Sequence, residues 1–266
     1  MALVPDTSGP TELTVATYNI HGGIGNDGRF DLGRIAAVLQ EVDADAVALQ
    51  EVGDFRGKGP AINQATVLGD MLGCAMIYQP TILRGDRAYG NAIATRLPVD
   101  GSRSYDLSVR KREPRGCVRA DVRLGPHPMH VFALHLGLSR AEQKAQAGML
   151  LSADIVRDAA VAWPLVVMGD FNFWFPGPIA RTVRRSLKDV AILGGRRERT
   201  YPSRLPYFRL DRIYVDDAWE VLSVNVHRTP LARVASDHLP LVARLRLRAE
   251  AIALPARAER GVLATP

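Results

Sequence analysis

The chain of 266 residues has little cysteine, few aromatic residues and no long apolar run. Its two cysteines, Cys74 and Cys117, are too few for a disulfide framework and lack the paired spacing of a zinc motif. Isolated thiols are typical of a reducing compartment, so we expect a cytoplasmic protein. The longest apolar stretch, residues 161–168, is interrupted by Pro164 and is far shorter than the roughly 18 residues that cross a bilayer.

The composition is that of a globular protein, with 47% hydrophobic and 23% charged residues, which excludes disorder for most of the chain. The length fits one domain with a large core, and we expect a monomer. Residues 1–11 and 249–266 show no sustained periodicity and are expected to be flexible tails around a domain at 12–248. The first residues also lack the basic and apolar segments of a secretory signal.

The charge is positive, with a net value of +6 and a pI of about 9.6. A basic surface favours a polyanionic partner, either nucleic acid or the anionic surface of a membrane touched from one side. However, only four of the 34 basic residues are lysines, so the arginine excess is explained equally well by codon bias. The sequence leaves open whether the charge serves binding or is a solvated face.

Hydrophobic periodicity predicts strands that alternate with helices. The predicted strands are residues 13–19, 46–49, 75–79, 91–95, 117–124, 129–135, 165–168, 210–215, 219–226 and 241–247, and the predicted helices are 32–39, 64–72, 139–160 and 179–187. Ser139 and Glu142 form a capping-box pattern at the start of the longest helix. Several adjacent strands mixed with helices predict an α/β layered sandwich.

Polar residues with acid, amide or imidazole side chains lie at the ends of the apolar runs. They are Asn19, Glu51, His135, Asp170, Asn172, Asp211, Asp237 and His238. Each has a structural explanation when taken singly, because short polar side chains stabilise turns and helix caps. Together they indicate one rim at which strands deliver a cluster of carboxylates. Such a cluster is costly to bury without a cation or bound ligands.

Six short motifs contain most of these residues. They are TYNIHGG at 17–23, LQEV at 49–52, YGNAI at 89–93, GDFN at 169–172, RLDRI at 209–213 and SDHLP at 236–240. In this order, over residues 13–247, the chain resembles the deoxyribonuclease I-like superfamily of endonucleases, exonucleases and phosphatases, and in detail its bacterial metal-dependent hydrolase branch. The resemblance implies a four-layer α/β/β/α sandwich, in which two packed mixed sheets are flanked by helices.

The resemblance also implies a role for each residue. Glu51, Asn19 and Asp237 correspond to an oxygen-rich metal site, and oxygen ligands suit Mg²⁺ or Mn²⁺ rather than zinc. His238 resembles a histidine paired with a buried aspartate, here Asp211. The catalytic set is completed by Asp170, which positions or deprotonates the attacking water, by Asn172 and by a second histidine, His135. Asn91 and either Arg112 or Arg115 resemble contacts to the phosphate.

The implied activity is hydrolysis of a phosphodiester or phosphomonoester by an activated water. We slightly favour a small-molecule or lipid-headgroup phosphodiester, because no dedicated nucleic-acid module is visible. A DNA or RNA nuclease is the alternative, and a non-catalytic binding protein is a remote one.

Two groups of residues bear on this choice of substrate. Four aromatic residues at 171 and 173–175 either contact the substrate or pack their own loop. A set of arginines either follows a phosphate backbone or is solvated, and it comprises Arg181, Arg184, Arg185, Arg196, Arg197 and Arg199.

Overall fold

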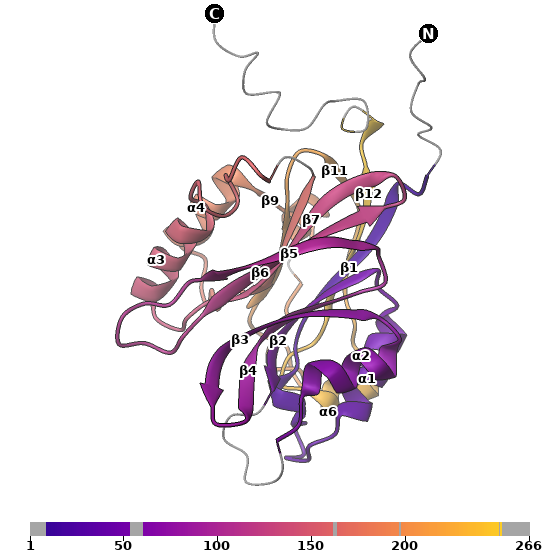
Figure 1. Ribbon diagram of the computed structural model, residues 1–266, viewed down its shortest axis with the longest axis vertical. Helices are drawn as coiled ribbons and strands as arrows, with labels where there is room; N and C mark the ends of the chain where they lie inside the picture. Colours follow the sequence, from indigo (N-terminus) through magenta and orange to yellow (C-terminus); the bar gives the residue numbers. More distant parts are fainter. Residues whose placement is uncertain (1–8, 54–60, 162–163, 197, 250, 252–266) are drawn as a thin grey trace, which may run out of the picture.

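The computed structural model describes residues 9–53, 61–161, 164–196, 198–249 and 251. Twelve strands in this part of the chain form two sheets of six strands each (Figure 1). The first sheet has the order β11-β12-β1-β2-β4-β3, with β1 (Glu12–Asn19), β2 (Ala46–Gly53), β3 (Ala75–Arg84), β4 (Arg87–Thr95), β11 (Trp219–Val226) and β12 (Leu241–Leu247). The second has the order β5-β6-β7-β8-β10-β9, with β5 (Val99–Asp106), β6 (Gly116–Leu124), β7 (His127–His135), β8 (Leu165–Asp170), β9 (Lys188–Asp189) and β10 (Asp211–Val215).

Helices cover the outer faces of both sheets. The helices are α1 (Leu32–Val42), α2 (Gln64–Leu72), α3 (Arg140–Leu150), α4 (Pro178–Ser186), α5 (Val190–Leu193) and α6 (Pro230–Ala235), with a short 3₁₀ turn, η1 (His21–Gly23). Helices α1, α2 and α6 pack on the first sheet, whereas α3 and α4 pack on the second (Figure 1). The predicted four-layer α/β/β/α sandwich is confirmed.

The strands at the centre of the molecule are buried on both faces. Along β1, Leu13 and Val15 point into the core between the sheets, whereas Ala16 and Tyr18 point toward the helices on the outside. Successive side chains of a strand alternate between its two faces, so a strand covered on both sides reads as a continuous apolar run. This explains why the central strands could be located from the sequence.

The longest predicted helix is wrong in its second half. Ser139 and Glu142 do form a capping box at the start of α3, but the helix ends at Leu150 and turns follow. The hydroxyl of Ser152 accepts a hydrogen bond from the backbone N–H of Asp154 at 3.1 Å. Such a local side-chain bond offers the backbone an alternative to the helix, and it closes the turn where the periodicity predicted continuation.

Three further features differ from the sequence prediction or lie beyond it. Strand β5 and helix α6 were not predicted; β5 is an edge strand with mostly exposed side chains and therefore lacks apolar alternation. Of the expected tails, residues 1–8, 250 and 252–266 lie outside the described residues, as does Arg197. Within the described part, no helix has both the length and the apolar character that crossing a bilayer would require.

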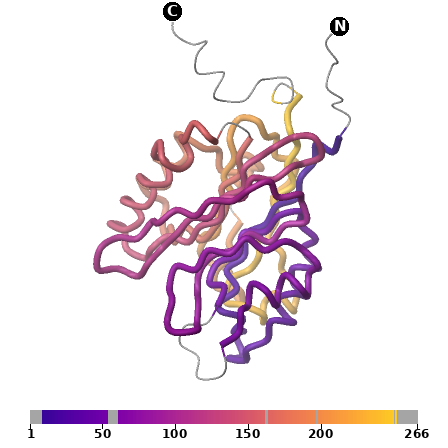
Figure 2. Tube along the Cα trace, in the orientation of Figure 1, coloured from indigo at the N-terminus to yellow at the C-terminus, as the bar shows by residue number. Residues whose placement is uncertain are grey.

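The first and last strands of the domain are neighbours. Strand β1 pairs antiparallel with β12, from Glu12 opposite Arg246 to Thr17 opposite Leu241. The indigo and yellow ends of the trace run side by side for this reason (Figure 2). Because β1 also pairs in parallel with β2, the carboxyl ends of β1 and β2 meet the segment that enters β12 at one rim of the sheet.

Candidate functional site

The second sheet brings three site residues together through its register. His135 is opposite Asp170 at the carboxyl ends of the parallel strands β7 and β8. Strand β10 runs antiparallel to β8, so its first residue, Asp211, also lies opposite Asp170. The rim is therefore set by strand pairing, which places each of the three side chains at a strand end.

Asn19 joins the two sheets at this rim. Its Nδ2 donates hydrogen bonds to Oε1 of Glu51 at 3.0 Å and to Oδ2 of Asp170 at 3.2 Å. Its Oδ1 accepts the backbone N–H of His21 at 3.0 Å, and its carbonyl accepts the hydroxyl of Ser236 at 2.7 Å. One buried amide thus orients a carboxylate from each sheet, and it also holds the loop before His238.

Glu51 is turned toward the rim by an irregularity in β2. The register between β2 and β4 shifts between Leu49 and Val52, and Glu51 itself has a φ of +59°. A bulge of this kind re-aims a side chain beside a functional site. The side chain of Gln64 fixes the distorted strand end, because its Oε1 accepts the N–H of Gly53 and its Nε2 donates to the carbonyl of Gly22, both at 2.8 Å.

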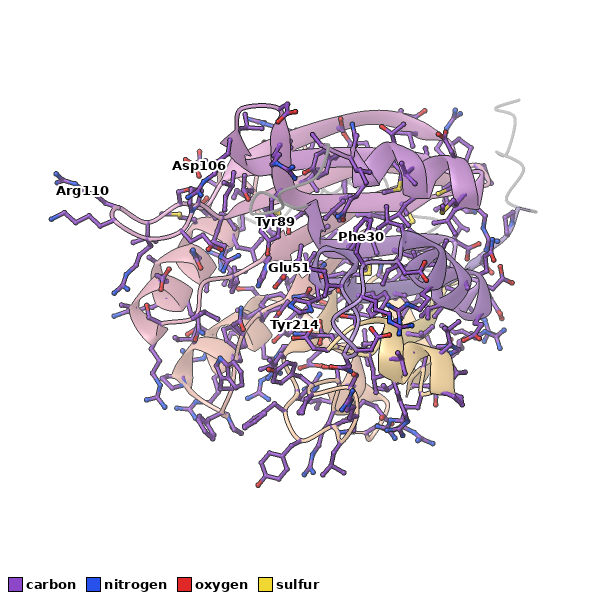
Figure 3. All side chains as sticks on the ribbon, turned by 90° about the horizontal axis from the view of Figure 1, so that it is seen from below. Phe30, Glu51, Tyr89, Asp106, Arg110 and Tyr214 are labelled. Atoms are coloured by element: carbon purple, nitrogen blue, oxygen red, sulfur yellow. The ribbon has the colours of Figure 1, made fainter. Side chains whose placement is uncertain are left out.

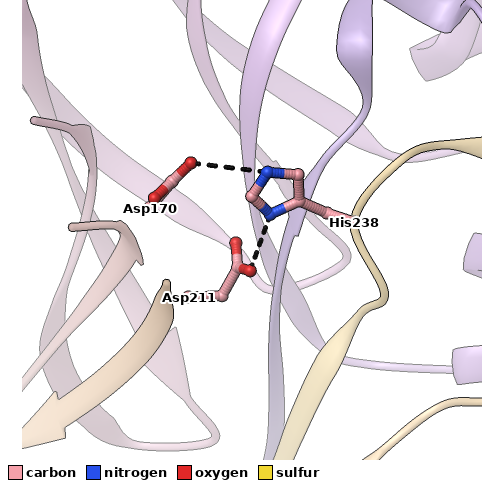
Figure 4. A group of neighbouring side chains, drawn as sticks. All are labelled: Asp170, Asp211 and His238. Carbon is pink, nitrogen blue, oxygen red and sulfur yellow. Dashed lines mark hydrogen bonds and ion pairs between the residues drawn. The ribbon is translucent and has the colours of Figure 1, made fainter. Parts of the chain in front are cut away.

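His238 forms a buried charged pair with Asp211 (Figure 4). Its Nδ1 lies 2.8 Å from Oδ2 of Asp211, and its Nε2 lies 3.7 Å from Oδ2 of Asp170. Burial by itself would lower the pKa of His238, but Asp211, Asp170 and Asp237 outweigh it and raise the pKa to about 10. The imidazole is therefore cationic at neutral pH, and Asp211 holds its orientation.

Asp170 is a buried carboxyl with a raised pKa. Burial is the main cause and the charge of Asp211 adds to it, while His238 opposes the shift; together they raise the pKa of Asp170 to about 6. Its Oδ1 accepts the backbone N–H of Asn172 at 2.9 Å, and the φ of Asn172 is +51°. A carboxyl poised near neutrality can exchange a proton with a water in the cavity.

His135 is in the opposite state from His238. Burial, the charge of Arg115 and that of His238 hold the pKa of His135 well below its usual value. One guanidinium nitrogen of Arg115 lies 3.2 Å from Nδ1 of His135. Nε2 of His135 lies 3.1 Å from the amide nitrogen of Asn172 and 3.5 Å from Oδ2 of Asp170. The rim therefore holds one neutral and one cationic imidazole.

These side chains surround a cavity of about 420 Å³. Most residues predicted for the site line it, namely Glu51, Arg115, His135, Asp170, Asn172, Asp237 and His238. Asp211 lies behind His238, and Asn19 lies behind Glu51 and Asp170.

Two residues that were expected to contact phosphate are not among the residues that line the cavity. Asn91 is buried and donates its amide to the carbonyl of Gly116 at 3.0 Å, so it holds the start of β6. Arg112 is exposed, and its Nε lies 4.0 Å from a carboxylate oxygen of Glu142. Arg115 is buried and faces His135. Between the two arginines, only Arg115 is placed to meet a ligand in the cavity.

The cavity carries an excess of negative charge. Among the described residues, neither Glu51 nor Asp237 forms an ion pair with a lysine or arginine. Burial and the charges of Asp237, Asp170 and Glu51 raise the pKa of Tyr201, which lines the same cavity. Tyr89 lies next to Glu51 (Figure 3), and burial together with that carboxylate holds the pKa of its phenol well above the usual range.

The donor set at the cavity fits a hard divalent cation near Glu51 and Asp237, because carboxylate oxygens are the ligands that Mg²⁺ prefers and neither carboxylate has a lysine or arginine partner among the described residues. A different group, Asp170, Asp211 and His238, has ligand atoms within 4.8 Å of one another. It is a poorer cation site, because the ring of His238 is already charged and bonded to Asp211. The amide N–H of Asn19, which was predicted to bind the metal, faces Glu51, so Asn19 orients that carboxylate.

Several residues at or beside the cavity were not among the predicted site residues. Thr200 donates its hydroxyl to Oδ2 of Asp211 at 2.5 Å, and the ring of Tyr201 lies 4.8 Å from that of His238. Glu113 lines the cavity and pairs with Arg115 at 3.1 Å. All three come from irregular segments in which no periodicity marks a buried position.

The four aromatic residues at 171 and 173–175 were predicted either to contact the substrate or to pack their own loop, and they differ in which they do. Phe171 and Phe173 are buried in the core beneath α3 and α4, so they pack their own loop. Trp174 instead lines the cavity and stands edge-on to the ring of Tyr201 at 5.6 Å, and Phe175 is exposed. Of the four rings, only that of Trp174 lines this cavity.

Comparison with known proteins gives consistent matches over nearly the whole domain. The model of the endonuclease/exonuclease/phosphatase family matches residues 16–238. The uncharacterized protein YbhP of Escherichia coli (strain K12) is 31% identical over 263 residues, which cover 92% of this chain and 100% of that protein.

Solved structures give the same result. An endonuclease/exonuclease/phosphatase from Beutenbergia cavernae is 26% identical with a TM-score of 0.69, over 90% of this chain and 72% of that one. A mannosyl-6-phosphatase from Bacteroides thetaiotaomicron is 19% identical with a TM-score of 0.67, over 88% of this chain and 99% of that one, and it shares the fold.

Proposed function

Because the chain belongs to the endonuclease/exonuclease/phosphatase family, we propose that it is a divalent-metal-dependent phosphoesterase that hydrolyses its substrate by attack of an activated water. One observation carries the proposal. Oδ2 of Asp170 lies 3.5 Å from Nε2 of the neutral His135 and 3.7 Å from Nε2 of the cationic His238. A carboxyl between two imidazoles of opposite protonation state is a device for moving protons.

Each residue has a role that follows from its surroundings. Asp170 accepts a proton from the attacking water, because its pKa of about 6 leaves it ionised but basic at neutral pH. His238, held by Asp211, presents a positive charge to the phosphate and a proton for the leaving oxygen. Arg115 and His135 bind the phosphoryl oxygens that face them, and a guanidinium suits this task through its planar fork.

The cation would be held by two other carboxylates of the cavity. Glu51 and Asp237 would hold Mg²⁺ or Mn²⁺, with Asn19 orienting Glu51 through its N–H. When bound, the metal would neutralise charge on the phosphoryl oxygens and on the leaving alkoxide.

For the substrate, we propose a small-molecule phosphodiester or phosphomonoester, a lipid headgroup included. A cavity of about 420 Å³ accommodates a small organic phosphate with its leaving group. Action on DNA or RNA by the same mechanism is the second candidate, and it is favoured by the net charge of +6.

The experiment is a hydrolysis screen with Mg²⁺, with Mn²⁺ and with a chelator. The substrates are bis-p-nitrophenyl phosphate, p-nitrophenyl phosphate, sphingomyelin, inositol phosphates and a single-stranded oligonucleotide. We expect metal-dependent release of product from at least one ester, and loss of about 10²- to 10⁴-fold in kcat in Asp170→Asn and His238→Gln.

Matched controls separate chemistry from folding. Asp217→Asn and His227→Gln change the same residue types on the surface, where they form ion pairs with Lys188 and Glu41. Both controls should keep the wild-type rate. If Asp170→Asn and His238→Gln also keep it while folding normally, the proposed catalytic assignments are wrong.

A further inference from the structure

A second cavity adjoins the first and is lined by arginines and aromatic rings. Its volume is about 720 Å³, and its lining includes Ala180 and Arg184 of α4 and Arg212 of β10. Five arginines line it, namely Arg184, Arg196, Arg199, Arg209 and Arg212, and its aromatic lining is Phe173, Trp174, Tyr207 and Phe208. Trp174 lines both cavities, so a ligand in the first can extend into the second past this ring.

The positive charge of this cavity is only partly balanced. Asp189 is buried and shared by two guanidiniums, those of Arg209 and Arg212. Glu198 pairs with Arg196 at 3.4 Å and also with Arg228. Five lining guanidiniums against these two carboxylates leave a formal excess of three positive charges.

Two of the arginines have no carboxylate partner in the part of the chain that the structure describes. Arg184 is exposed on the last turn of α4, and Arg199 is exposed with its guanidinium 5.4 Å from the ring centre of Tyr207. An arginine that a neighbouring ring holds in place loses little freedom when it binds an anion.

Arg212 is the buried member of the set. Its side chain is only 7% exposed, and its guanidinium lies 5.2 Å from the ring centre of Phe173. Within the described residues, its Nε and the Nε of Arg209 have no hydrogen-bond acceptor. A buried donor without an acceptor is costly, and an anionic oxygen in the cavity would remove the cost.

We propose that this cavity binds a second phosphate group of the substrate. The inference rests on the proposed function, because it places the reacting phosphate in the first cavity and the second phosphate beyond Trp174. The substrate class is therefore a compound with two phosphate groups joined by a spacer that passes the ring of Trp174.

The aromatic rings form a continuous path between the two sites. Tyr201 lies 4.8 Å from His238, Trp174 lies 5.6 Å from Tyr201, and Phe208 lies 5.1 Å from Trp174. Planar groups such as nucleic-acid bases stack on such rings without sequence preference. A planar group carried by the spacer, such as a base on the sugar that joins two phosphates, fits this path.

The first experiment compares two esters with the same leaving group. One is the p-nitrophenyl ester of thymidine 5′-phosphate, and the other carries an additional 3′-phosphate. We expect the double variant Arg184→Gln/Arg199→Gln to raise KM for the second ester about tenfold and to leave the first within about twofold. Arg123→Gln, an exposed arginine at the far end of β6, is the matched control and should change neither.

The second experiment identifies where the second phosphate comes from. Binding of fluorescein-labelled dT12 and of thymidine 3′,5′-bisphosphate to the full chain is measured over a range of salt concentrations. For a nucleic-acid strand, losing two phosphate contacts should reduce the slope of log K against log salt by about 1.4. If only the bisphosphate binds, and the double variant weakens it, the site serves a small molecule; either result supports the proposal.

Other outcomes overturn the inference. The inference is wrong if the double variant raises KM equally for both esters. It is also wrong if the double variant changes neither KM for either ester nor the binding of either ligand. Loss of binding to vesicles of phosphatidylglycerol and phosphatidylcholine with no change in the other measurements would overturn it as well. The proposed function is tested separately from this inference. If the wild type hydrolyses neither ester, the binding of the bisphosphate and of dT12 still shows whether the second cavity, called the arginine cavity, holds a phosphate.

Discussion

The hydroxyl of Thr200 lies 2.5 Å from Oδ2 of Asp211, the same carboxylate oxygen that faces Nδ1 of His238 at 2.8 Å. Asp211 is fully buried, and its other oxygen has no partner in the described part of the chain. The orientation of His238 therefore depends on a single carboxylate oxygen that Thr200 helps to fix. Thr200 is a positioning residue, since it does not line the cavity.

Replacement of Thr200 by valine should slow catalysis without weakening binding. Valine keeps the volume but removes the donor, so Asp211 and His238 lose part of their fixed orientation. We expect kcat to fall about tenfold with KM nearly unchanged, and stability to fall by about 1–2 kcal/mol. Steady-state kinetics and urea unfolding measure the two effects. Thr182→Val, on the exposed face of α4, should change neither. A rise in KM with unchanged kcat would contradict a positioning role.

Glu51→Gln should weaken the response to metal. The substitution removes a negative charge but keeps an oxygen and most of the hydrogen bonding to Asn19. We expect the Mg²⁺ concentration that gives half-maximal activity to rise about tenfold or more, and calorimetric Mg²⁺ binding to weaken in parallel. Glu220→Gln, on the surface of β11, is the control. If the Mg²⁺ titrations of Glu51→Gln and Glu220→Gln coincide, Glu51 is not a metal ligand.

The stability of the second sheet should fall in acid because of Asp121. Burial would raise the pKa of Asp121, but the hydrogen bond and charge of His130 and the charge of Arg119 outweigh burial and lower it. A carboxyl with a lowered pKa stabilises the folded state above its unfolded pKa of about 3.9, and this stability is lost as pH falls through the folded value.

Urea unfolding of Asp121→Asn tests this sign. The variant should be less stable than wild type at pH 7, and the difference should shrink as the pH is lowered toward 3. Asp100→Asn, an exposed residue that pairs with Arg123, should show no such convergence. A difference that stays constant or grows in acid would mean that the carboxylate does not provide this stability.

Gly53→Ala should damage the fold and the site together. Gly53 has a φ of +111°, and a Cβ there would lie 2.0 Å from the carbonyl oxygen of Ala88. The end of β2 would have to move, and Glu51 would move with it. We expect a loss of about 2 kcal/mol or more and a loss of activity. Gly148→Ala, in open space on α3, should instead stabilise by about 0.5–1 kcal/mol. Unfolding curves of the two variants provide the comparison.

The sequence located the site residues better than it assigned their contacts. Asn19, Glu51 and Asp170 were found because each ends an apolar strand, and strand ends are visible in the hydrophobic pattern. Asn91 ends no such run, and its amide is used by the carbonyl of Gly116. The choice between Arg112 and Arg115 depends on how one loop turns, which periodicity does not encode.

The parts that could not be predicted have physical reasons in common. Thr200 and Tyr201 lie in a segment without regular structure, so nothing in the pattern marks them as buried or facing the cavity. The end of α3 depends on one hydroxyl, that of Ser152, which competes with helical hydrogen bonds. The arginine cavity combines side chains from α4, two loops and β10, so its shape exists only after the chain has folded.

The two sheets differ in whether their strands are contiguous in the sequence. All strands of the second sheet come from one continuous segment, β5 to β10, whereas the first sheet takes its last two strands, β11 and β12, from the end of the domain. Domains fold during synthesis as their segments leave the ribosome. A nascent chain therefore has all six strands of its second sheet before Asp237 and His238 have been translated. The candidate site therefore gains its last two side chains only after the second sheet is complete in sequence.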